Sequence, residues 1–327
     1  AKSMNKYFER GYARKVPLTE QGGDQFFHPH FGVTKPGEPG KVRVVFDAAR
    51  QLRGQSMNDR LLSGPALQAQ LPQVLIRFRK NPVAVTADIE AMFSRVRVSD
   101  SDARLQRFFW SATPEQEPEV YEMTRLMFGM KCSPFLAIWA TRRAAKDSGV
   151  PGALEVVERN LYVDDYLDSR RTEAEAEQAA LAAVRGLAYG DFPLVGFRSN
   201  SARVAAALTV ANGEKATITV DMPTGVSTSG TPADPLEGDS NPRKPGVLVS
   251  LGESDQMQRV LGVIWNPETD CLGFRVSVPV SIPDTRRSQL SAVASWYDPL
   301  GLASPLIVQA KIALREAVSY THLRAHE

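Results

Sequence analysis

Two adjacent carboxylates, Asp164 and Asp165, lie between short apolar runs in the stretch from Asn160 to Ser169. The pattern predicts a tight β-hairpin with the two acids at its tip. Neighbouring carboxylates repel each other, and a divalent cation relieves the repulsion because hard cations such as Mg²⁺ prefer carboxylate oxygens. A solvated turn explains the same residues, since Asp is common in turns. The dipeptide alone leaves both interpretations open.

A third acid, Asp88, ends the apolar run 83–87, which is typical of a buried strand. An acid in that position is placed to line a site. Glu90 follows, and we expect it to form a structural ion pair rather than a metal bond. A strand-end acid and an acidic hairpin can meet on one antiparallel sheet. Acids so placed can hold two Mg²⁺ ions roughly 3.5–4 Å apart, which activate a 3′-hydroxyl and stabilise the leaving pyrophosphate.

Other segments must position these acids. Strands are predicted at 31–35 and 41–47, joined by the turn 36–40, so that Lys35 and Arg43 can stand together to hold a triphosphate. A solvated charged face explains the two cations equally well. Helices are predicted after Ser63, at 134–146, from Thr172 to Gly190, at 286–294 and at 306–317, and Ser133 is the expected N-cap of the second of these. Further strands are predicted at 104–110, 119–124 and 192–197.

Composition excludes several classes of protein. The chain has 327 residues, of which 43% are hydrophobic and 23% charged, enough for a real core in one multi-lobed unit or two domains. The net charge of +2 means that nucleic-acid binding must come from local patches. Only Cys132 and Cys271 are present, which argues against a disulfide scaffold or zinc ribbon and fits a reducing compartment. No apolar run reaches about 18 residues, so we expect no membrane span. No signal peptide is visible, and we expect the chain to be part of a longer polyprotein.

Several motifs occur in a fixed order, and together they carry a family resemblance. The chain resembles a reverse transcriptase of BEL/Pao-class LTR retrotransposons from about Phe26 to about Glu316. The carriers are Lys41-Val-Arg-Val-Val-Phe-Asp47, Ser56-Met-Asn-Asp59, Leu62-Ser-Gly-Pro65, Thr86-Ala-Asp-Ile-Glu-Ala-Met-Phe93, Phe128-Gly-Met-Lys-Cys-Ser-Pro134, Tyr162-Val-Asp-Asp165, Leu261-Gly262 and Asp298-Pro-Leu-Gly-Leu302.

The resemblance implies an α+β fold, a right-hand polymerase of fingers, palm and thumb with an antiparallel palm sheet packed on helices. The expected parts are an N-terminal arm (1–25), fingers and palm (26–210), a flexible Gly-, Pro-, Ser- and Thr-rich insertion (211–256), the end of the palm with the primer grip (257–282), the start of the thumb or connection in a Pao-type region (283–318) and a tail foreign to the chain (319–327).

The resemblance also implies roles for individual residues. Asp88, Asp164 and Asp165 match the catalytic acids: Asp88 and Asp164 as direct ligands of two Mg²⁺ ions (Mn²⁺ can substitute), and Asp165 through electrostatics. Ile89 adds a backbone carbonyl to the metal site. Phe93 matches the bulky gate that clashes with a ribose 2′-hydroxyl. The remaining expected site residues are Lys35, Arg43, Phe128, Gly129 and Met130 for the incoming nucleotide and templating base, and Tyr162, Leu261 and Gly262 for the primer.

The partners implied are an RNA template, a DNA or tRNA primer and dNTPs, in a cytoplasmic virus-like particle of the retroelement. Ribonuclease H, integrase and protease signatures are missing from the chain; Asp284-Thr285 is followed by Arg286 rather than by the Gly of an aspartic protease. Two alternatives stay open. One is a catalytically inactive, domesticated or truncated element that binds nucleic acid, and the other is a Pao-type aspartic peptidase in the C-terminal third.

Overall fold

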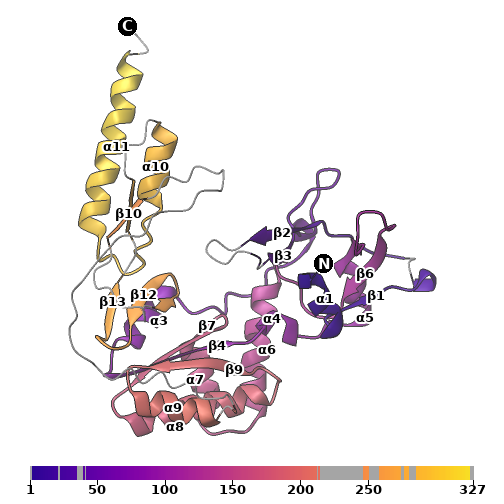
Figure 1. Ribbon diagram of the computed structural model, residues 1–327, viewed down its shortest axis with the longest axis horizontal. Helices are drawn as coiled ribbons and strands as arrows, with labels where there is room; N and C mark the ends of the chain where they lie inside the picture. Colours follow the sequence, from indigo (N-terminus) through magenta and orange to yellow (C-terminus); the bar gives the residue numbers. More distant parts are fainter. Residues whose placement is uncertain are drawn as a thin grey trace, which may run out of the picture. The chain divides into compact units, whose positions relative to one another are not determined.

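The computed structural model describes residues 2–20, 23–34, 40, 42–211, 213, 246–249, 258–273, 276–279 and 285–324 (Figure 1). The chain divides into two compact units. The first comprises residues 1–197 and 203–213, and the second comprises 198–202 and 214–327. Each unit is described by itself.

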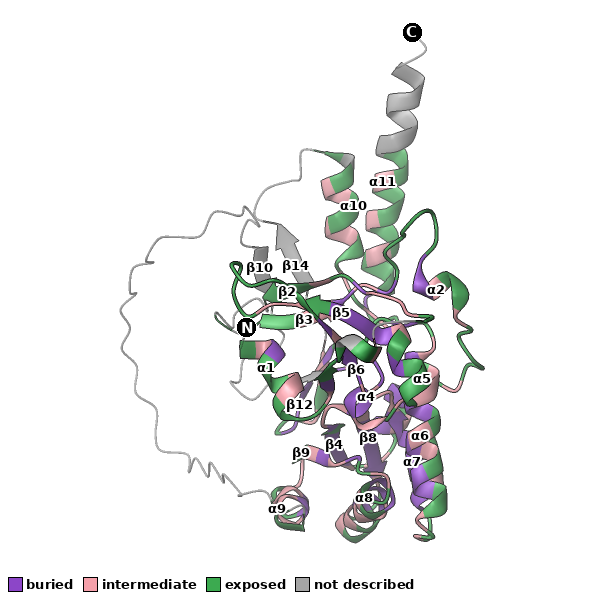
Figure 2. Ribbon diagram, turned by 90° about the vertical axis from the view of Figure 1, so that its right-hand side faces the viewer, coloured by how far each residue is buried: buried purple, intermediate pink, exposed green. Residues whose placement is uncertain are grey.

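A four-stranded sheet forms the centre of the first unit, in the order β7-β8-β4-β9. β4 (Val83–Ile89) pairs antiparallel with β8 (Asp165–Arg170) from Val83↔Arg170 to Asp88↔Asp165, and β7 (Leu161–Tyr162) pairs antiparallel with β8. β9 (Leu194–Ser199) lies on the far side of β4. The predicted strands therefore share one sheet, and β4 and β8 are largely buried within it (Figure 2).

Three helices contact one another beside this sheet: α6 (Ser133–Asp147), α7 (Ala153–Asn160) and α8 (Glu173–Ala188). Small residues permit the close packing, because α8 buries Ala176, Ala180 and Ala183. A Cβ at Gly186 would lie 2.6 Å from Cβ of Ala153. Pro134 in the first turn of α6 and Thr172 as the N-cap of α8 agree with the predicted helix starts. The prediction of Ser133 as N-cap is wrong: Ser133 is already the first residue of α6, and its hydroxyl donates to the Met127 carbonyl at 2.6 Å. α9 (Ala202–Ala211) adds Val204 and Leu208 to the same core.

A second core lies around the sheet β1-β6-β5, in which β1 (Ala13–Lys15) and β5 (Arg107–Trp110) flank β6 (Glu119–Met123). The prediction of two strands joined by a polar loop is confirmed for β5 and β6. Around it lie α1 (Lys2–Glu9), η1 (Leu18–Glu20), α2 (Met57–Arg60), α5 (Asp100–Ala103), η2 (Arg104–Gln106) and the hairpin of β2 (His30–Thr34) with β3 (Val42–Phe46).

The expectation of a peripheral arm over residues 1–25 is wrong for its described part. β1 pairs with β6, and Met4 and Val16 are buried. The cause is long-range pairing: the buried Glu122 carboxylate accepts from Arg14 Nε at 2.9 Å and forms an ion pair with buried Arg107 at 3.1 Å. Polar, turn-rich composition did not reveal these partners.

The helix predicted to open after Ser63 begins later, since α3 spans Leu71–Phe78. Gly64 has φ +74°, and a Cβ there would lie 2.4 Å from the Phe135 ring. The extended segment before α3 thus packs closely on α6, and Pro72 suits the first helical turn.

The second unit contains a hairpin-built sheet of β11 (Gln258–Val260), β12 (Val263–Asn266) and β13 (Cys271–Gly273), and an antiparallel pair of β10 (Gly246–Val249) and β14 (Val276–Pro279). α10 (Arg286–Ala294) and α11 (Ser304–Arg324) pack together. The predicted insertion 211–256 lies outside the described residues except for 211, 213 and β10. The chain is therefore α+β with antiparallel strand pairs, and none of its described helices has the length and apolarity needed to span a membrane.

Candidate active site

The hairpin β7–β8 and the end of β4 bring the three predicted acids to one end of the sheet. Tyr162 pairs with Asp165 across a two-residue turn, so Asp164 lies in the turn while Asp165 is the first residue of β8. Asp88 is the register partner of Asp165 on β4. The backbone N–H of Ile89 donates to the carbonyl of Asp164 at 2.9 Å, which ties the turn to the end of β4. The predicted juxtaposition of Asp88 with the acidic hairpin is thus present.

Burial raises the pKa values of all three acids, and repulsion adds to the shift of Asp88 and Asp165. Burial first, and then Asp164 and Asp88, raise the pKa of Asp165 to about 7. Desolvation followed by the charge of Asp164 raises the pKa of Asp88 to about 6, although its side chain still reaches solvent. Burial also raises the pKa of Asp164, against a lowering by its own backbone N–H. A cation placed here would favour all three ionised forms.

The donor types suit a hard divalent cation, because carboxylate oxygens are the ligands that Mg²⁺ prefers. Within the residues that the structure describes, no three His, Cys, Asp or Glu side chains converge as a ready metal-binding group. The three acids therefore lie at the same end of the sheet and interact electrostatically, but their side chains do not converge on one metal position.

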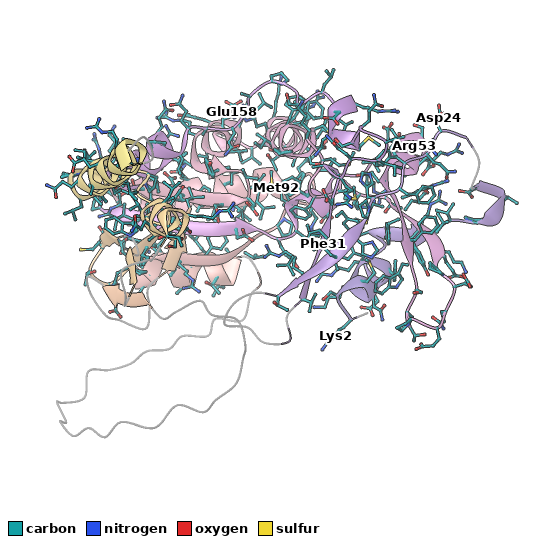
Figure 3. The ribbon with its side chains drawn as sticks, turned by 90° about the horizontal axis from the view of Figure 1, so that it is seen from above. Lys2, Asp24, Phe31, Arg53, Met92 and Glu158 are labelled. Atoms are coloured by element: carbon teal, nitrogen blue, oxygen red, sulfur yellow. The ribbon has the colours of Figure 1, made fainter. Side chains whose placement is uncertain are left out.

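Phe93 and Phe128 form an aromatic pair. Their ring centroids lie 4.4 Å apart at an interplanar angle of 41°. Phe93 lies in α4 (Met92–Arg95), which follows Ala91 at φ +55°, and it is 8% exposed, whereas Phe128 is 47% exposed. Met92, which is labelled in Figure 3, precedes Phe93 in α4 and is buried. The two predicted nucleotide-side aromatics thus meet, although they lie far apart in the sequence.

Gly129 is held by both its backbone and its surroundings. Its φ is +90°, and a Cβ would lie 2.8 Å from the Phe46 carbonyl oxygen. Asn58 Nδ2 donates to the Gly129 carbonyl at 3.0 Å, and the Lys131 N–H donates to Asn58 Oδ1 at 2.8 Å. Asn58 is a positioning residue that pattern reasoning missed, although it lies inside the quoted motif Ser56-Met-Asn-Asp59. Met130 is buried in the second core rather than presented at the surface.

The β2–β3 hairpin carries Arg43, which is exposed and lies opposite Val33. Phe31 lies on the same hairpin and is 52% exposed (Figure 3). The second predicted cation, Lys35, lies outside the described residues. The structure therefore shows Arg43 accessible on its strand and leaves its pairing with Lys35 as a prediction.

Glu90 forms ion pairs with Arg95 at 2.9 Å and with Arg10 at 3.4 Å, which confirms the expected structural role.

Pattern reasoning missed a buried chain of polar groups on β8. Tyr166 Oη donates to Asp168 Oδ2 at 3.1 Å, and Arg170 Nε donates to the same oxygen at 2.8 Å. Their alternate spacing on one strand was the available signal.

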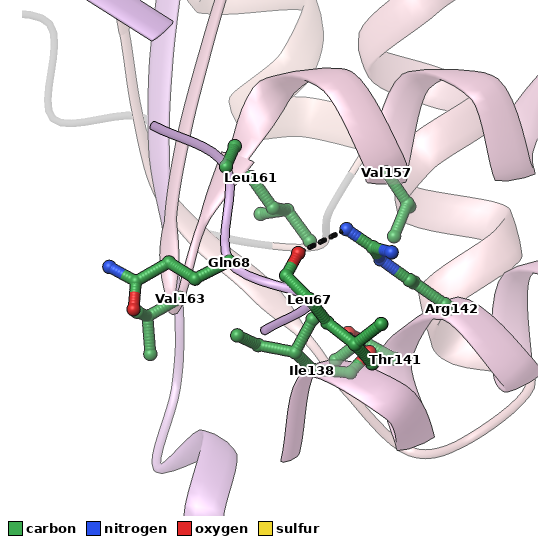
Figure 4. A pocket seen from close by; sticks show the side chains of 9 residues that line it. Leu67, Gln68, Ile138, Thr141, Arg142, Val157, Leu161 and Val163 are labelled. Carbon is green, nitrogen blue, oxygen red and sulfur yellow. Dashed lines mark hydrogen bonds between the residues drawn. The ribbon is translucent and has the colours of Figure 1, made fainter. Parts of the chain in front are cut away.

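A small pocket lies on the other side of the hairpin (Figure 4). Arg142 closes part of it by donating from Nη2 to the Leu67 carbonyl at 2.6 Å. Leu161 and Val163, which flank Tyr162, belong to its lining. The backbone that carries Asp164 is therefore supported by the segment before α3 and by α6.

Leu261 and Gly262, predicted to contact the primer, form the two-residue turn between β11 and β12 in the second unit. Their φ values are +50° and +87°. A Cβ at Gly262 would lie 2.4 Å from Cε1 of Tyr297, so the turn packs on that ring. Tyr162 lies in the first unit, and the placement of the two primer candidates relative to each other stays a prediction.

A comparison with family models finds the Pao retrotransposon-like RNaseH-like domain at residues 285–324. The match falls on the segment expected to begin the thumb or connection and extends into the tail predicted at 319–327. Its RNaseH-like description disagrees with the expectation that the chain carries no ribonuclease H signature. Asp298 and Glu316 are the two acids of this segment. Asp298 accepts from the N–H groups of Leu302 and Ala303 at 3.0 and 2.6 Å, so it caps the turn before α11.

Among solved structures, the chain is similar to foamy viral protease-reverse transcriptase in complex with double-stranded DNA. The identity is 21% and the TM-score 0.42, over 59% of this chain and 30% of that chain. Prototype foamy virus protease-reverse transcriptase matches at 20% identity and a TM-score of 0.44, over 58% and 22%. The foamy viral protein in complex with an RNA/DNA hybrid matches at 19% and 0.43, over 58% and 22%.

The chain thus spans less than a third of the length of these proteins, and TM-scores below 0.5 do not identify its activity. No curated protein matches it. The match at residues 285–324 agrees with the motifs quoted above, and the chain is BEL/Pao-like and related to retroelement Pol polyproteins.

Proposed function

We propose that this chain is an RNA-directed DNA polymerase that uses two Mg²⁺ ions. The observation that carries the proposal is the register of the palm-like sheet, in which Asp88 faces Asp165 and the Ile89 N–H holds the Asp164 carbonyl. These contacts bring together acids that are distant in the sequence, at one end of the sheet, where burial raises the pKa values of all three and neighbouring carboxylates raise those of Asp88 and Asp165 further.

In the proposed reaction the primer 3′-oxygen attacks the α-phosphorus of a dNTP. One P–O bond forms, the α–β phosphoanhydride bond breaks, and pyrophosphate leaves. Bound Mg²⁺ would lower the pKa of the attacking hydroxyl and offset the charge of the phosphates. Asp88 and Asp164 would turn toward the ions as ligands, and Asp165 would add negative charge. Arg43, exposed on β3, would attract the triphosphate.

Primer extension on poly(rA)/oligo(dT) with Mg²⁺ tests the activity. Wild type should incorporate dTTP, and Asp164→Asn should fall to background because a neutral amide is a poor metal ligand. Asp147→Asn is the matched control, since Asp147 lies on α6 and pairs with Arg143. Equal background incorporation by wild type and Asp164→Asn would instead support the nucleic-acid-binding, inactive alternative.

The Phe93–Phe128 pair supports a proposed sugar gate. A buried aromatic ring leaves no room for a 2′-hydroxyl and offers it no hydrogen bond. Phe93→Val should therefore admit ribonucleotides while dNTP incorporation continues. Unchanged sugar discrimination in this variant would place the gate at another residue.

A further inference from the structure

Arg97 and Arg125 lie directly opposite each other in an isolated antiparallel β-bridge. Backbone hydrogen bonds hold the bridge on both sides: the Leu126 N–H donates to the Val96 carbonyl at 2.9 Å, and the Val98 N–H donates to the Thr124 carbonyl at 3.3 Å. Directly opposite residues in such a bridge have Cβ atoms about 4.5–5.5 Å apart. Two guanidinium groups therefore project from adjacent, fixed positions.

Carboxylates near this bridge are already engaged by other arginines. Arg95 binds Glu90 at 2.9 Å and Asp191 at 3.3 Å, and Arg10 also binds Glu90. Among the residues that the structure describes, neither Arg97 nor Arg125 makes an ion pair. The Arg125 side chain donates only to the Thr124 carbonyl, at 3.4 Å.

This arrangement differs from another pair of neighbouring arginines in the first unit, Arg77 and Arg159. Arg77 donates to the Arg159 carbonyl at 2.7 Å, and Arg159 has a carboxylate partner, Glu155, at 3.0 Å. Like charges placed opposite each other on paired strands are destabilising unless something neutralises them. Partial burial and, after it, the charge of Arg97 lower the pKa of Arg125, while Tyr12 and Asp191 act in the opposite direction.

We propose that Arg97 and Arg125 form a phosphate-binding site, with the planar forks of the two guanidinium groups holding one anionic group between them. Guanidinium groups suit phosphate because they donate two parallel hydrogen bonds. The phosphate can come from a nucleic-acid backbone or from a free phosphate ion. Recognition is the same in both cases, and the experiment separates them.

The site has a structural connection to the nucleotide-side aromatics. Arg97 lies just beyond the end of α4, which carries Phe93, and Arg125 lies shortly before Phe128 in the chain. A phosphate held by both arginines would tighten the same bridge that keeps the two rings 4.4 Å apart. The binding itself does not depend on polymerase activity.

Thermal unfolding in inorganic phosphate, against chloride at equal ionic strength, tests the site. Phosphate should raise the Tm of wild type by a few degrees and that of Arg97→Gln, Arg125→Gln and the double variant by much less. Without phosphate, Arg97→Gln should melt about one to two degrees above wild type, because the like-charge repulsion is gone. Arg203→Gln is the matched control, since Arg203 is exposed and pairs with Glu173.

Fluorescence anisotropy of a labelled oligothymidylate separates the two sources of phosphate. An affinity several-fold lower for Arg97→Gln than for Arg203→Gln identifies a nucleic-acid backbone. Equal oligonucleotide affinities, with the phosphate-dependent Tm shift lost, identify a free phosphate ion. Equal phosphate-dependent shifts in wild type and both single variants would overturn the proposal, and the exposed position of Arg97 makes its variant suitable if the double variant does not fold.

Discussion

The hairpins β7–β8 and β11–β12 both close with a two-residue turn, but their turns differ in backbone conformation. Each has a two-residue turn, Val163-Asp164 in the first and Leu261-Gly262 in the second. Each places a bulky residue at positive φ, +59° at Val163 and +50° at Leu261. Positive φ is uncommon for any residue except Gly, and for a β-branched residue it is a true outlier.

The difference lies in the second turn position. Gly262 also has positive φ, so β11–β12 has the φ pattern of a type I′ turn, which suits the twist of paired strands. In β7–β8 only Val163 is positive, the φ pattern of a type II′ turn, where Gly normally occupies that position. Val163 therefore carries strain of about 1–3 kcal/mol. The pairing of Asp88 with Asp165 and the packing of Val163 offset that strain, at the turn that presents Asp164.

The largest loss of stability is expected from a substitution in the β11–β12 hairpin. Gly262→Ala would place Cβ 2.4 Å from the Tyr297 ring and force Ala to φ +87°, so the second unit should lose about 2 kcal/mol or more. Urea unfolding followed through tryptophan fluorescence measures the loss, since buried Trp265 lies in β12. Gly273→Ala is the control because nothing lies within 4 Å of its Cβ position. Equal losses would mean both that Tyr297 moves aside and that Ala tolerates the φ of +87° without cost.

Sequence reasoning correctly predicted the features that depend on neighbouring residues, such as helix starts and the β7–β8 hairpin. α6, α8 and α10 begin at caps or prolines that the sequence displays, and the apolar runs on both sides of Asp164 and Asp165 predicted the hairpin. It placed both acids at the tip, whereas Asp165 already belongs to β8. What it missed depends on contacts between distant segments: β1 on β6, the Asn58 clamp on Gly129, and the Arg97–Arg125 bridge. No periodicity encodes such partners, because each residue is ordinary in its own segment.

Removing the negative charge of Asp165 should increase the stability of the β7–β8 hairpin at neutral pH. Burial and neighbouring carboxylates raise the pKa of Asp165 to about 7 in the fold, so its neutral form is favoured there. The free energy of unfolding should therefore fall as pH rises from about 4 to about 7, where the unfolded chain ionises before the folded one. Asp165→Asn should flatten this dependence and gain on the order of 1 kcal/mol above about pH 7, after allowance for solvent screening.

Thermal unfolding between about pH 4 and about pH 8 with EDTA measures this effect. Asp147→Asn, which removes an acid from α6, should leave the slope unchanged. A lower Tm for Asp165→Asn across that whole range would show that the carboxylate stabilises the hairpin through a contact other than charge.

A smaller gain is expected from Val163→Gly. Relief of about 1–3 kcal/mol of backbone strain is opposed by roughly 1–2 kcal/mol from the greater freedom of unfolded Gly and the lost packing beside Leu161, leaving a net gain of about 1 kcal/mol or less. Primer extension should slow in the same variant, because a flexible turn no longer fixes Asp164. A variant that is both less stable and fully active would show that the turn is not strained.

The smallest effect is expected from Leu261→Asn, which converts the turn to Asn-Gly, the preferred type I′ pair. Because Gly262 already has the required φ, the gain should be only a few tenths of a kcal/mol to about 1 kcal/mol. Thermal unfolding beside Val163→Gly compares the two turns directly. If Leu261 contacts the primer as the family resemblance implies, primer affinity should fall while the Tm stays level or rises. A clear loss of Tm would instead mean that the Leu261 side chain packs within the second unit, and the two hairpins would then share one solution: surroundings that hold a bulky residue where glycine would fit.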